Sequence, residues 1–324
     1  DKLRELEKRK QTIITTIDEQ GKLTPDLRTR LENSWDAMEI EDIYLPYKPK
    51  RRTRAEVARE KGLEPLAKIL MIQTENNLDI RAQAFVKNDV ADTEEALKGA
   101  RDIIAEWISE NERARNMVRS IFRKGAIISS HVVKGKEEEA AKYRDYFDWS
   151  EPLRRCSSHR LLAVRRGESE GFLKVSIEPD SELCIERLEG LFVKNATASA
   201  AQVNEAVRDG YKRLLKPSIE TEFAALSKEQ ADDEAIRVFT ENLRQLLLAA
   251  PLGQKRVMGI DPGYRTGCKL VCLDEQGNLL HNETIYPHPP KQDVVGASRK
   301  VTKLVEAYNI QAIAIGKGTA SRET

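Results

Sequence analysis

The sequence predicts a mostly α-helical region followed by the beginning of an α/β domain, and three observations support this fold class. Apolar residues recur at helical spacing through most of residues 2–250. Three apolar runs separated by turn residues then occupy residues 257–285, which indicates an antiparallel meander of three strands. A helical pattern at residues 294–308 and an apolar strand at residues 310–315 complete the order strand-strand-strand-helix-strand.

Composition narrows the class of protein without assigning a partner. The 324 residues are 40% hydrophobic and 33% charged, which suffices for two or three domains with sizeable cores. The net charge is +1, so a nucleic-acid surface would have to come from local segregation of charge, and the 6% of aromatic residues disfavours large stacking platforms. No apolar run reaches the length of a membrane span. The cysteines lack metal-binding spacing, and we expect them to pack, reduced, in a cytoplasmic protein.

The linker between the two regions is expected at Pro251, Leu252 and Gly253. The helical region should therefore span residues 1–253, and the first half of the α/β domain should span residues 254–324. An α/β unit needs a further helix to cover its sheet after such a strand, so we expect the chain to be a fragment of a longer protein.

The first two helices have clear boundary signals. Residues 2–20 carry an amphipathic pattern that Gly21 is expected to end. Thr24 suits the N-cap of a second helix, and Pro25 suits its first position. The apolar stripe expected for this second helix consists of Leu27, Leu31, Trp35 and Met38.

A basic segment follows. Residues 43–49 are expected to be extended because two prolines interrupt them, and they lead into a run of cations. Such a run could contact phosphates. The alternative is a solvated loop, or one whose cations pair with the upstream Glu39, Glu41 and Asp42. The candidate nucleic-acid-binding residues of this segment are Lys48, Lys50, Arg51, Arg52 and Arg54.

Helical patterns dominate the middle of the chain. The clearest of several short helices lies at residues 91–110, where Asp92 or Thr93 can cap the first turn. The last run of patterns reaches residue 250 and is expected to kink or break at Pro217. Its final apolar group is expected in the core: Ile236, Phe239, Leu243, Leu246 and Leu247.

Three stretches between these helices have weaker signals. Residues 125–133 are apolar and ambiguous between strand and helix. Residues 135–146 are expected to form a short charged helix, and residues 171–178 a strand.

A helix expected at residues 160–166 lies in a region that is dense in cations. Its candidate phosphate-binding residues are Arg160, Arg165 and Arg166. Pairing of these cations with Glu168, Glu170 or the acidic stretch at residues 145–151 is the favoured alternative.

A glycine turn, Gly316-Lys317-Gly318-Thr319, follows the last strand. It lacks the upstream glycine of a nucleotide-binding loop, because that position is Gln311. Its backbone N–H groups, with Lys317 and Arg322 alongside, could still hold a nucleic-acid phosphate, and simple capping of a following helix is the alternative.

The strand order, with Asp261 at the end of the first strand, resembles the ribonuclease H-like fold, and G-I-D-P-G-Y-R-T-G at residues 259–267 resembles its YqgF branch. L-P-Y-K-P-K-R-R-T-R-A at 45–55, S-H-R-L-L-A-V-R-R-G-E at 158–168 and I-G-K-G-T-A-S-R-E-T at 315–324 resemble the Tex family of bacterial transcription accessory proteins. These segments occur in the family's order and span most of the chain.

This resemblance bears on catalysis. Nucleases of the ribonuclease H-like fold hold two divalent cations with clustered carboxylates. Asp261 takes the place of the first ligand, Glu323 is the candidate for the second, and a later ligand would come from a helix beyond Thr324. We therefore expect Asp261 and Glu323 to be vestigial, with no metal site, no cofactor and no enzymatic activity in this chain.

The resemblance also implies a function. Tex proteins are cytoplasmic, associate with RNA or DNA and act in transcription; a helical region with a helix-turn-helix element precedes their YqgF-like domain and C-terminal nucleic-acid-binding modules. We expect a nucleic-acid-binding transcription accessory protein whose affinity lies mainly in modules outside this chain, with RNA polymerase or the transcription machinery as protein partner. The alternatives are a divalent-metal-dependent nuclease and a helical scaffold that docks on the transcription machinery.

Overall fold

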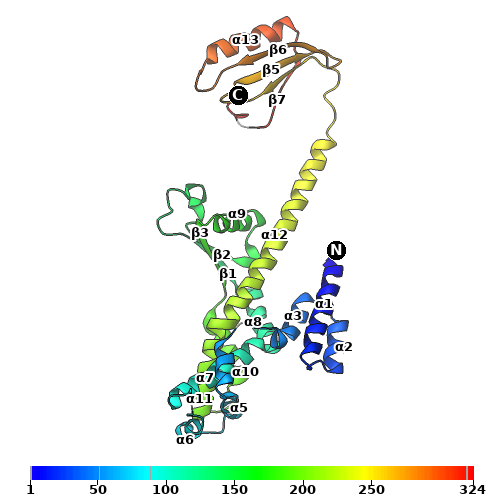
Figure 1. The fold of residues 1–324 in the computed structure, drawn as a ribbon. Helices are drawn as coiled ribbons and strands as arrows, with labels where there is room; N and C mark the ends of the chain where they lie inside the picture. Colours follow the sequence, from blue (N-terminus) through cyan, green and yellow to red (C-terminus); the bar gives the residue numbers. More distant parts are fainter. Residues whose placement is uncertain (1, 51, 88, 319) are drawn as a thin grey trace. The chain divides into compact units, whose positions relative to one another are not determined.

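The computed structural model describes residues 2–50, 52–87, 89–318 and 320–324. The chain divides into two compact units, Asp1–Thr240 and Glu241–Thr324 (Figure 1). The first unit is mainly helical, and the second contains a four-stranded sheet, so the predicted fold class is confirmed.

Three N-terminal helices form a small cluster with its own core. They are α1 (Lys2–Glu19), α2 (Pro25–Asn33) and α3 (Ala37–Tyr44). The Thr24 hydroxyl accepts a hydrogen bond from the Leu27 N–H at 3.2 Å, which confirms the predicted cap of α2. The buried residues of this cluster are Ile13, Ile14, Ile17, Leu31, Ile40, Ile43 and Tyr44.

The predicted stripe of the second helix is wrong beyond Asn33. The helix ends there, and Asp36 caps α3 by accepting a hydrogen bond from the Met38 N–H at 2.8 Å. Trp35 is 57% exposed, and its ring lies 3.9 Å from the Lys10 ammonium. The helical spacing of apolar residues therefore continues from α2 into α3, although the backbone between them is a loop. Asp36 in this loop caps the new helix.

The predicted extended segment is shorter than expected. Residues 43 and 44 still belong to α3, and a 3₁₀-helical turn, Leu45–Tyr47, follows. Extended backbone begins at Lys48, the residue before the second proline.

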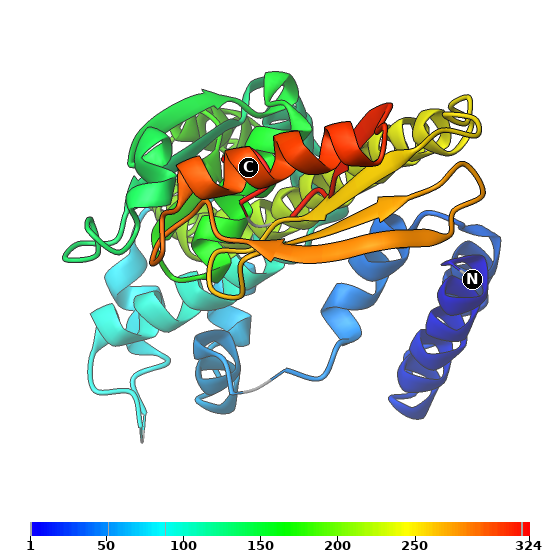
Figure 2. The same cartoon turned by 90° about the horizontal axis from the view of Figure 1, so that it is seen from above.

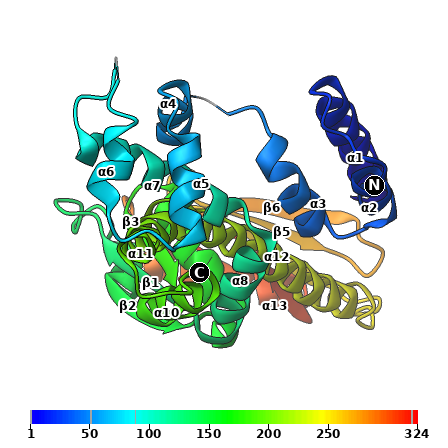
Figure 3. The same cartoon turned by 90° about the horizontal axis from the view of Figure 1, so that it is seen from below.

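The main core of the first unit surrounds α7 (Thr93–Glu110). Asp92 caps this helix by accepting a hydrogen bond from the Glu95 N–H at 2.7 Å, as the sequence predicts. Figure 3 shows α4, α5 and α11 gathered around it. The other helices of this region are α4 (Arg54–Glu60), α5 (Glu64–Ile72), α6 (Leu78–Gln83), α8 (Glu112–Gly125), α10 (Ser181–Phe192), α11 (Ala198–Gly210) and α12 (Lys216–Leu247).

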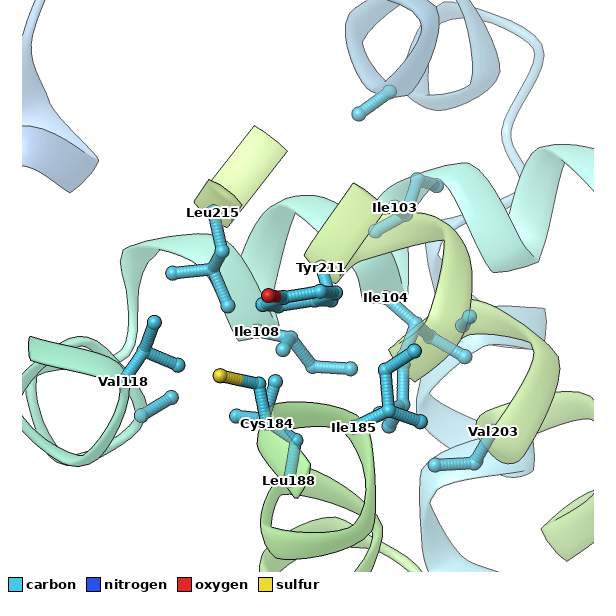
Figure 4. Packing of buried hydrophobic residues seen from close by; sticks show 14 of the residues in the cluster. Ile103, Ile104, Ile108, Val118, Cys184, Ile185, Leu188, Val203, Tyr211 and Leu215 are labelled. Carbon is cyan, nitrogen blue, oxygen red and sulfur yellow. The ribbon is translucent and has the colours of Figure 1, made fainter. Parts of the chain in front are cut away.

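Branched aliphatic side chains of α7 interlock with α10 and α11 (Figure 4). Gly210 permits the close contact, because a Cβ at that position would lie 3.1 Å from the Ala105 carbonyl oxygen. The Tyr211 ring is fully buried, and its hydroxyl hydrogen-bonds to Ser181 at 3.3 Å. Burial raises the pKa of Tyr211.

The helical chain does not break at Pro217. A π-helical segment, Tyr211–Leu215, separates α11 from α12, and Pro217 lies in the first turn of α12. A proline has no N–H to donate, and the hydrogen-bond pattern changes beside it without ending the helix, so the predicted break is wrong and the predicted kink stays a prediction.

A three-stranded antiparallel sheet resolves the ambiguous middle region. Its order is β2-β1-β3, with β1 (Ile127–Val132), β2 (Asp148–Pro152) and β3 (Leu173–Glu178). The sequence did not predict β2, and the charged helix predicted at 135–146 is only a 3₁₀ segment at Ala141–Tyr146. Helix α9 (Ser158–Ser169) packs against β3.

The second unit confirms the predicted meander. Its sheet has the order β6-β5-β4-β7, with β4 (Val257–Asp261), β5 (Cys268–Leu273), β6 (Leu279–Ile285) and β7 (Ala312–Ile315). Strand β7 is parallel to β4, and the other neighbours are antiparallel. Figure 2 shows α13 (Val294–Ala307) along one face of this sheet, where Ala297 and Leu304 enter the core.

The apolar group predicted for the core near the end of α12 is exposed. Phe239 is 66% exposed and Leu247 is 75% exposed, and Ile236, Leu243 and Leu246 are exposed as well. Helical spacing identifies the apolar face of a helix but not whether another element covers that face. In the described part of the chain, no helix is both long and apolar enough to cross a membrane.

Candidate nucleic-acid interface

The basic segment lies at the start of α4 and is held by carboxylates of α4 and α7. The Lys50 ammonium forms an ion pair with Glu110 and lies 3.4 Å from Glu106. Arg52 pairs with Glu60 at 3.0 Å. Lys50 is therefore already paired inside the fold, whereas the Arg52–Glu60 pair is exposed and screened by water.

The upstream carboxylates are not their partners. Glu39 lies 3.7 Å from Arg30, and Glu41 pairs with Arg9 at 2.6 Å. Asp42 is buried among arginines of α8. The sequence predicted, as an alternative, that cations of the basic segment form ion pairs. The predicted partners, which were chosen because they are near in sequence, are wrong.

Glu106 anchors this segment from inside the fold. Its carboxylate is buried and accepts hydrogen bonds from Arg59 at 2.7 Å and from the Thr53 hydroxyl at 3.1 Å. Burial raises the pKa of Glu106, but Arg59, Lys50 and Thr53 together outweigh burial, and the pKa lies below its ordinary value. Thr53 also caps α4 by accepting a hydrogen bond from the Glu56 N–H.

Two cations of the segment remain exposed without an ion pair among the described residues, Lys48 and Arg54. Arg51 lies outside the described residues. Among the described cations of this segment, Lys48 and Arg54 can therefore meet an external phosphate without breaking an ion pair.

Some of the candidate cations of α9 form ion pairs within the described chain, and one does not. Arg160 pairs with Glu151 at 3.0 Å, and Arg165 pairs with Glu168 at 2.7 Å. Both ion pairs agree with the favoured prediction that these cations pair with nearby carboxylates. Glu170, another predicted partner, pairs with Lys142 instead. Arg166 is exposed and has no ion pair among the residues that the structure covers.

The strand-end carboxylate of the second unit is exposed. Asp261 ends β4, next to β7, and the Gly316 N–H donates to the Ile260 carbonyl at 2.8 Å. A Cβ on Gly316 would lie 3.9 Å from the Asp261 carboxylate, so the glycine turn passes close to this group. Asp261 therefore stands where the sequence placed it, beside the glycine turn.

Glu323 is exposed, and its surroundings are those of a turn. It lies near Tyr264, whose pKa is raised by burial and by the charge of Glu323. No group of three or more His, Cys, Asp or Glu side chains that could hold a metal occurs in residues 2–50, 52–87, 89–318 and 320–324. The expectation of no metal site stays a prediction.

The glycine turn after β7 presents Lys317 and Arg322 at the surface. Neither has an ion pair within the described chain. Residues 320–324 form a turn, with a hydrogen bond from the Thr324 N–H to the Ala320 carbonyl, where the sequence suggested the start of a helix. Thr319 lies outside the described residues.

The sequence analysis did not predict a buried ionic cluster that joins α3, α8 and α12. Asp42 of α3 accepts hydrogen bonds from Arg115 at 2.7 Å and from Arg119 at 2.8 Å, both on α8. Glu222 of α12 accepts a hydrogen bond from Arg119 at 2.7 Å and also pairs with Arg115. Burial lowers the pKa of Arg119, but Asp42 and Glu222 outweigh burial and raise it. The one local signal was the spacing of two arginines by four residues on an otherwise apolar helix face.

Comparison with known proteins covers both units. The Tex central region-like family model matches residues 73–239, and the Tex protein YqgF-like domain model matches residues 255–324. Protein YhgF of Escherichia coli is 44% identical over 99% of this chain and 43% of its own length. Transcriptional accessory protein Tex of Neisseria gonorrhoeae is 40% identical over 99% of this chain and 43% of its own length.

A human relative, S1 RNA-binding domain-containing protein 1, is 28% identical over 100% of this chain and 34% of its own length. The chain spans less than half the length of these relatives. The family models cover the segments at residues 158–168 and 315–324, and the bacterial relatives match 99% of the chain. The chain belongs to the Tex family.

Proposed function

We propose that this chain is part of a transcription accessory protein that associates with nucleic acid, and that the chain itself is not catalytic. The observation that carries the proposal is the family match along both units. One relative is named as a transcriptional accessory protein, and another is named for an S1 RNA-binding domain. RNA is therefore the preferred nucleic acid in this proposal, and RNA polymerase is the expected protein partner.

The charge distribution supports weak, non-specific contact by this part of the protein. Lys48 and Arg54 of the first unit, and Lys317 and Arg322 of the second, are exposed cations without ion pairs in the described chain. Isolated phosphate contacts of this kind give affinity that falls steeply with salt and carries little sequence information.

The test is binding of labelled single-stranded RNA and duplex DNA at two salt concentrations, measured by fluorescence anisotropy. The variants are Lys48→Glu/Arg54→Glu and Lys317→Glu/Arg322→Glu. Arg144→Glu/Arg187→Glu is the control matched for charge and exposure, because both residues are exposed and without ion pairs in the described chain but lie outside the two candidate segments. We expect each test variant to flatten the salt dependence for RNA, by about 0.7 in logarithmic slope per lost contact, and the control to leave it unchanged.

Catalysis is tested in the same samples with Mg²⁺ on a denaturing gel. The expected result is intact RNA and DNA in every lane. Mg²⁺-dependent cleavage that disappears in Asp261→Ala would overturn the non-catalytic half of the proposal in favour of a metal-dependent nuclease. Binding that is insensitive to salt and to both test variants would overturn the nucleic-acid half.

A further inference from the structure

A pocket of about 460 Å³ with apolar and charged walls lies between α8, α9 and α12, and nothing in the proposed function uses it. Its wall includes Phe122 and Phe223, whose ring centroids are 5.2 Å apart. Its apolar lining also includes Met38, Leu153, Leu161 and Leu226. Cys156 also lines the pocket.

The mouth of this pocket carries free positive charge. Arg123 and Arg154 line it, are exposed, and have no ion pair among the described residues. Arg119 also lines the pocket, but Asp42 and Glu222 already neutralise it. Arg123 and Arg154 thus place two guanidinium groups, which have no ion pair in the described part of the chain, beside the apolar side chains of the cavity.

One carboxylate also lines the pocket. Glu234 of α12 lines the pocket and accepts a hydrogen bond from the Ser158 hydroxyl. The mouth therefore holds two unpaired cations against a single carboxylate that already has a partner. An occupant with negative charge at its edges complements this surface.

The apolar wall favours a peptide over a nucleic acid. Stacking of bases requires an exposed ring face, whereas Phe122 is 1% exposed and Phe223 is 9% exposed. An aliphatic or aromatic side chain can enter the cavity and remove its own surface from water, as anchor residues do in protein interfaces. Planar guanidinium groups then bind flanking carboxylates with two parallel hydrogen bonds.

We propose that this pocket docks a segment of a partner protein in which a Leu or Phe side chain is flanked by Asp or Glu. The apolar side chain fills the cavity, and Arg123 and Arg154 bind the flanking carboxylates. This interaction does not depend on binding of nucleic acid by the chain.

The test begins with an array of synthetic acidic peptides, each of which places one or two Leu, Phe, Trp or Met residues among Asp and Glu. The array is probed with the whole chain, and the strongest binder is labelled and titrated by anisotropy. Arg123→Glu/Arg154→Glu reverses the charge at the mouth, and Leu226→Trp fills the cavity. Both variants are expected to weaken binding at least about tenfold, whereas the control Arg144→Glu/Arg187→Glu is expected to bind like the wild type.

Folding of each variant is checked by thermal unfolding. If Leu226→Trp does not fold, Gln230→Trp at the exposed edge of the pocket replaces it. The proposal is overturned if no array peptide binds, or if the selected peptide binds both variants as tightly as the wild type. It is also overturned if a version of the peptide with Ser in place of the apolar residues binds equally well, or if single-stranded RNA displaces the peptide and loses affinity in the same variants, because the site would then recognise polyanions in general.

Discussion

The core around α7 and the junction between α3 and α8 stabilise the same unit by different interactions. Around α7, fully buried Ile103, Ile104 and Ile108 pack against branched side chains of neighbouring helices. At the junction, Asp42 and Glu222 are held by two arginines of α8. Each buried apolar side chain contributes to stability in proportion to its own buried area. In a buried ionic cluster, removal of one charge leaves its partners buried without compensation. Loss of one charge at the junction should therefore cost more than loss of one apolar side chain in the core.

The largest effect is expected for Asp42→Ala. This change leaves Arg115 and Arg119 buried with only Glu222 as a partner, and the free energy of unfolding should fall by about 4 kcal/mol. Urea unfolding monitored by circular dichroism measures it. Asp18→Ala, an exposed acidic residue on α1, is the control and should change stability by less than about 0.5 kcal/mol. Equal stability of the two variants would show that the cluster contributes nothing at the junction.

The core should respond somewhat less to Ile104→Ala. Ile104 is fully buried, so truncation removes apolar contacts and leaves a cavity, with an expected loss of about 3 kcal/mol. Ile80→Ala, on α6 and exposed, is the matched control for the same chemical change. A loss for Ile104→Ala greater than that for Asp42→Ala would reverse the comparison between the two regions.

An intermediate effect is expected for Glu106→Gln, and it should depend on pH. The folded-state pKa of Glu106 is lowered, so its ionised form contributes stability above the unfolded pKa, near 4.3, and this contribution is lost as pH falls through the folded value. The variant should be less stable than the wild type by about 2 kcal/mol at pH 7, and the difference should shrink towards zero as the pH falls below the unfolded pKa and through the lowered folded pKa. Unfolding curves across this pH range provide the measurement; a constant difference at all pH values would mean that the charge is not responsible.

The smallest effect is expected for Arg52→Ala. Its side chain is 72% exposed, and its pair with Glu60 is screened by water. Stability should change by less than about 0.5 kcal/mol, in contrast to Glu106→Gln a short distance away. A larger loss in thermal unfolding would place Arg52 among the structural cations of the segment.

The sequence predicted those features that depend on neighbours along the chain. Thr24 and Asp92 cap their helices, and the meander with its crossing helix is found as expected, because caps, turns and strand alternation are local signals. Strand β2 was missed because its residues carry no apolar alternation and are paired through β1.

The candidate site was less predictable from the sequence because it depends on contacts between residues that are distant along the chain. Which cations remain free depends on carboxylates far away in sequence, as with Lys50 and Glu110, or Arg119 and Glu222. A basic run in the sequence shows that positive charge is present, but it does not show whether carboxylates of the folded chain already pair with that charge. The helix-turn-helix element and the domain boundary after residue 253 stay predictions.

The thiol in the apolar pocket has a chemical consequence. Burial, with the hydrogen bond and charge of Glu151, raises the pKa of Cys156 to about 12. The thiolate, which is the nucleophile that attacks alkylating agents and disulfides, then makes up on the order of 10⁻⁵ of this residue at neutral pH. The raised pKa thus disfavours reaction of this sulfur with alkylating agents and disulfides at neutral pH, although the thiol lines a cavity.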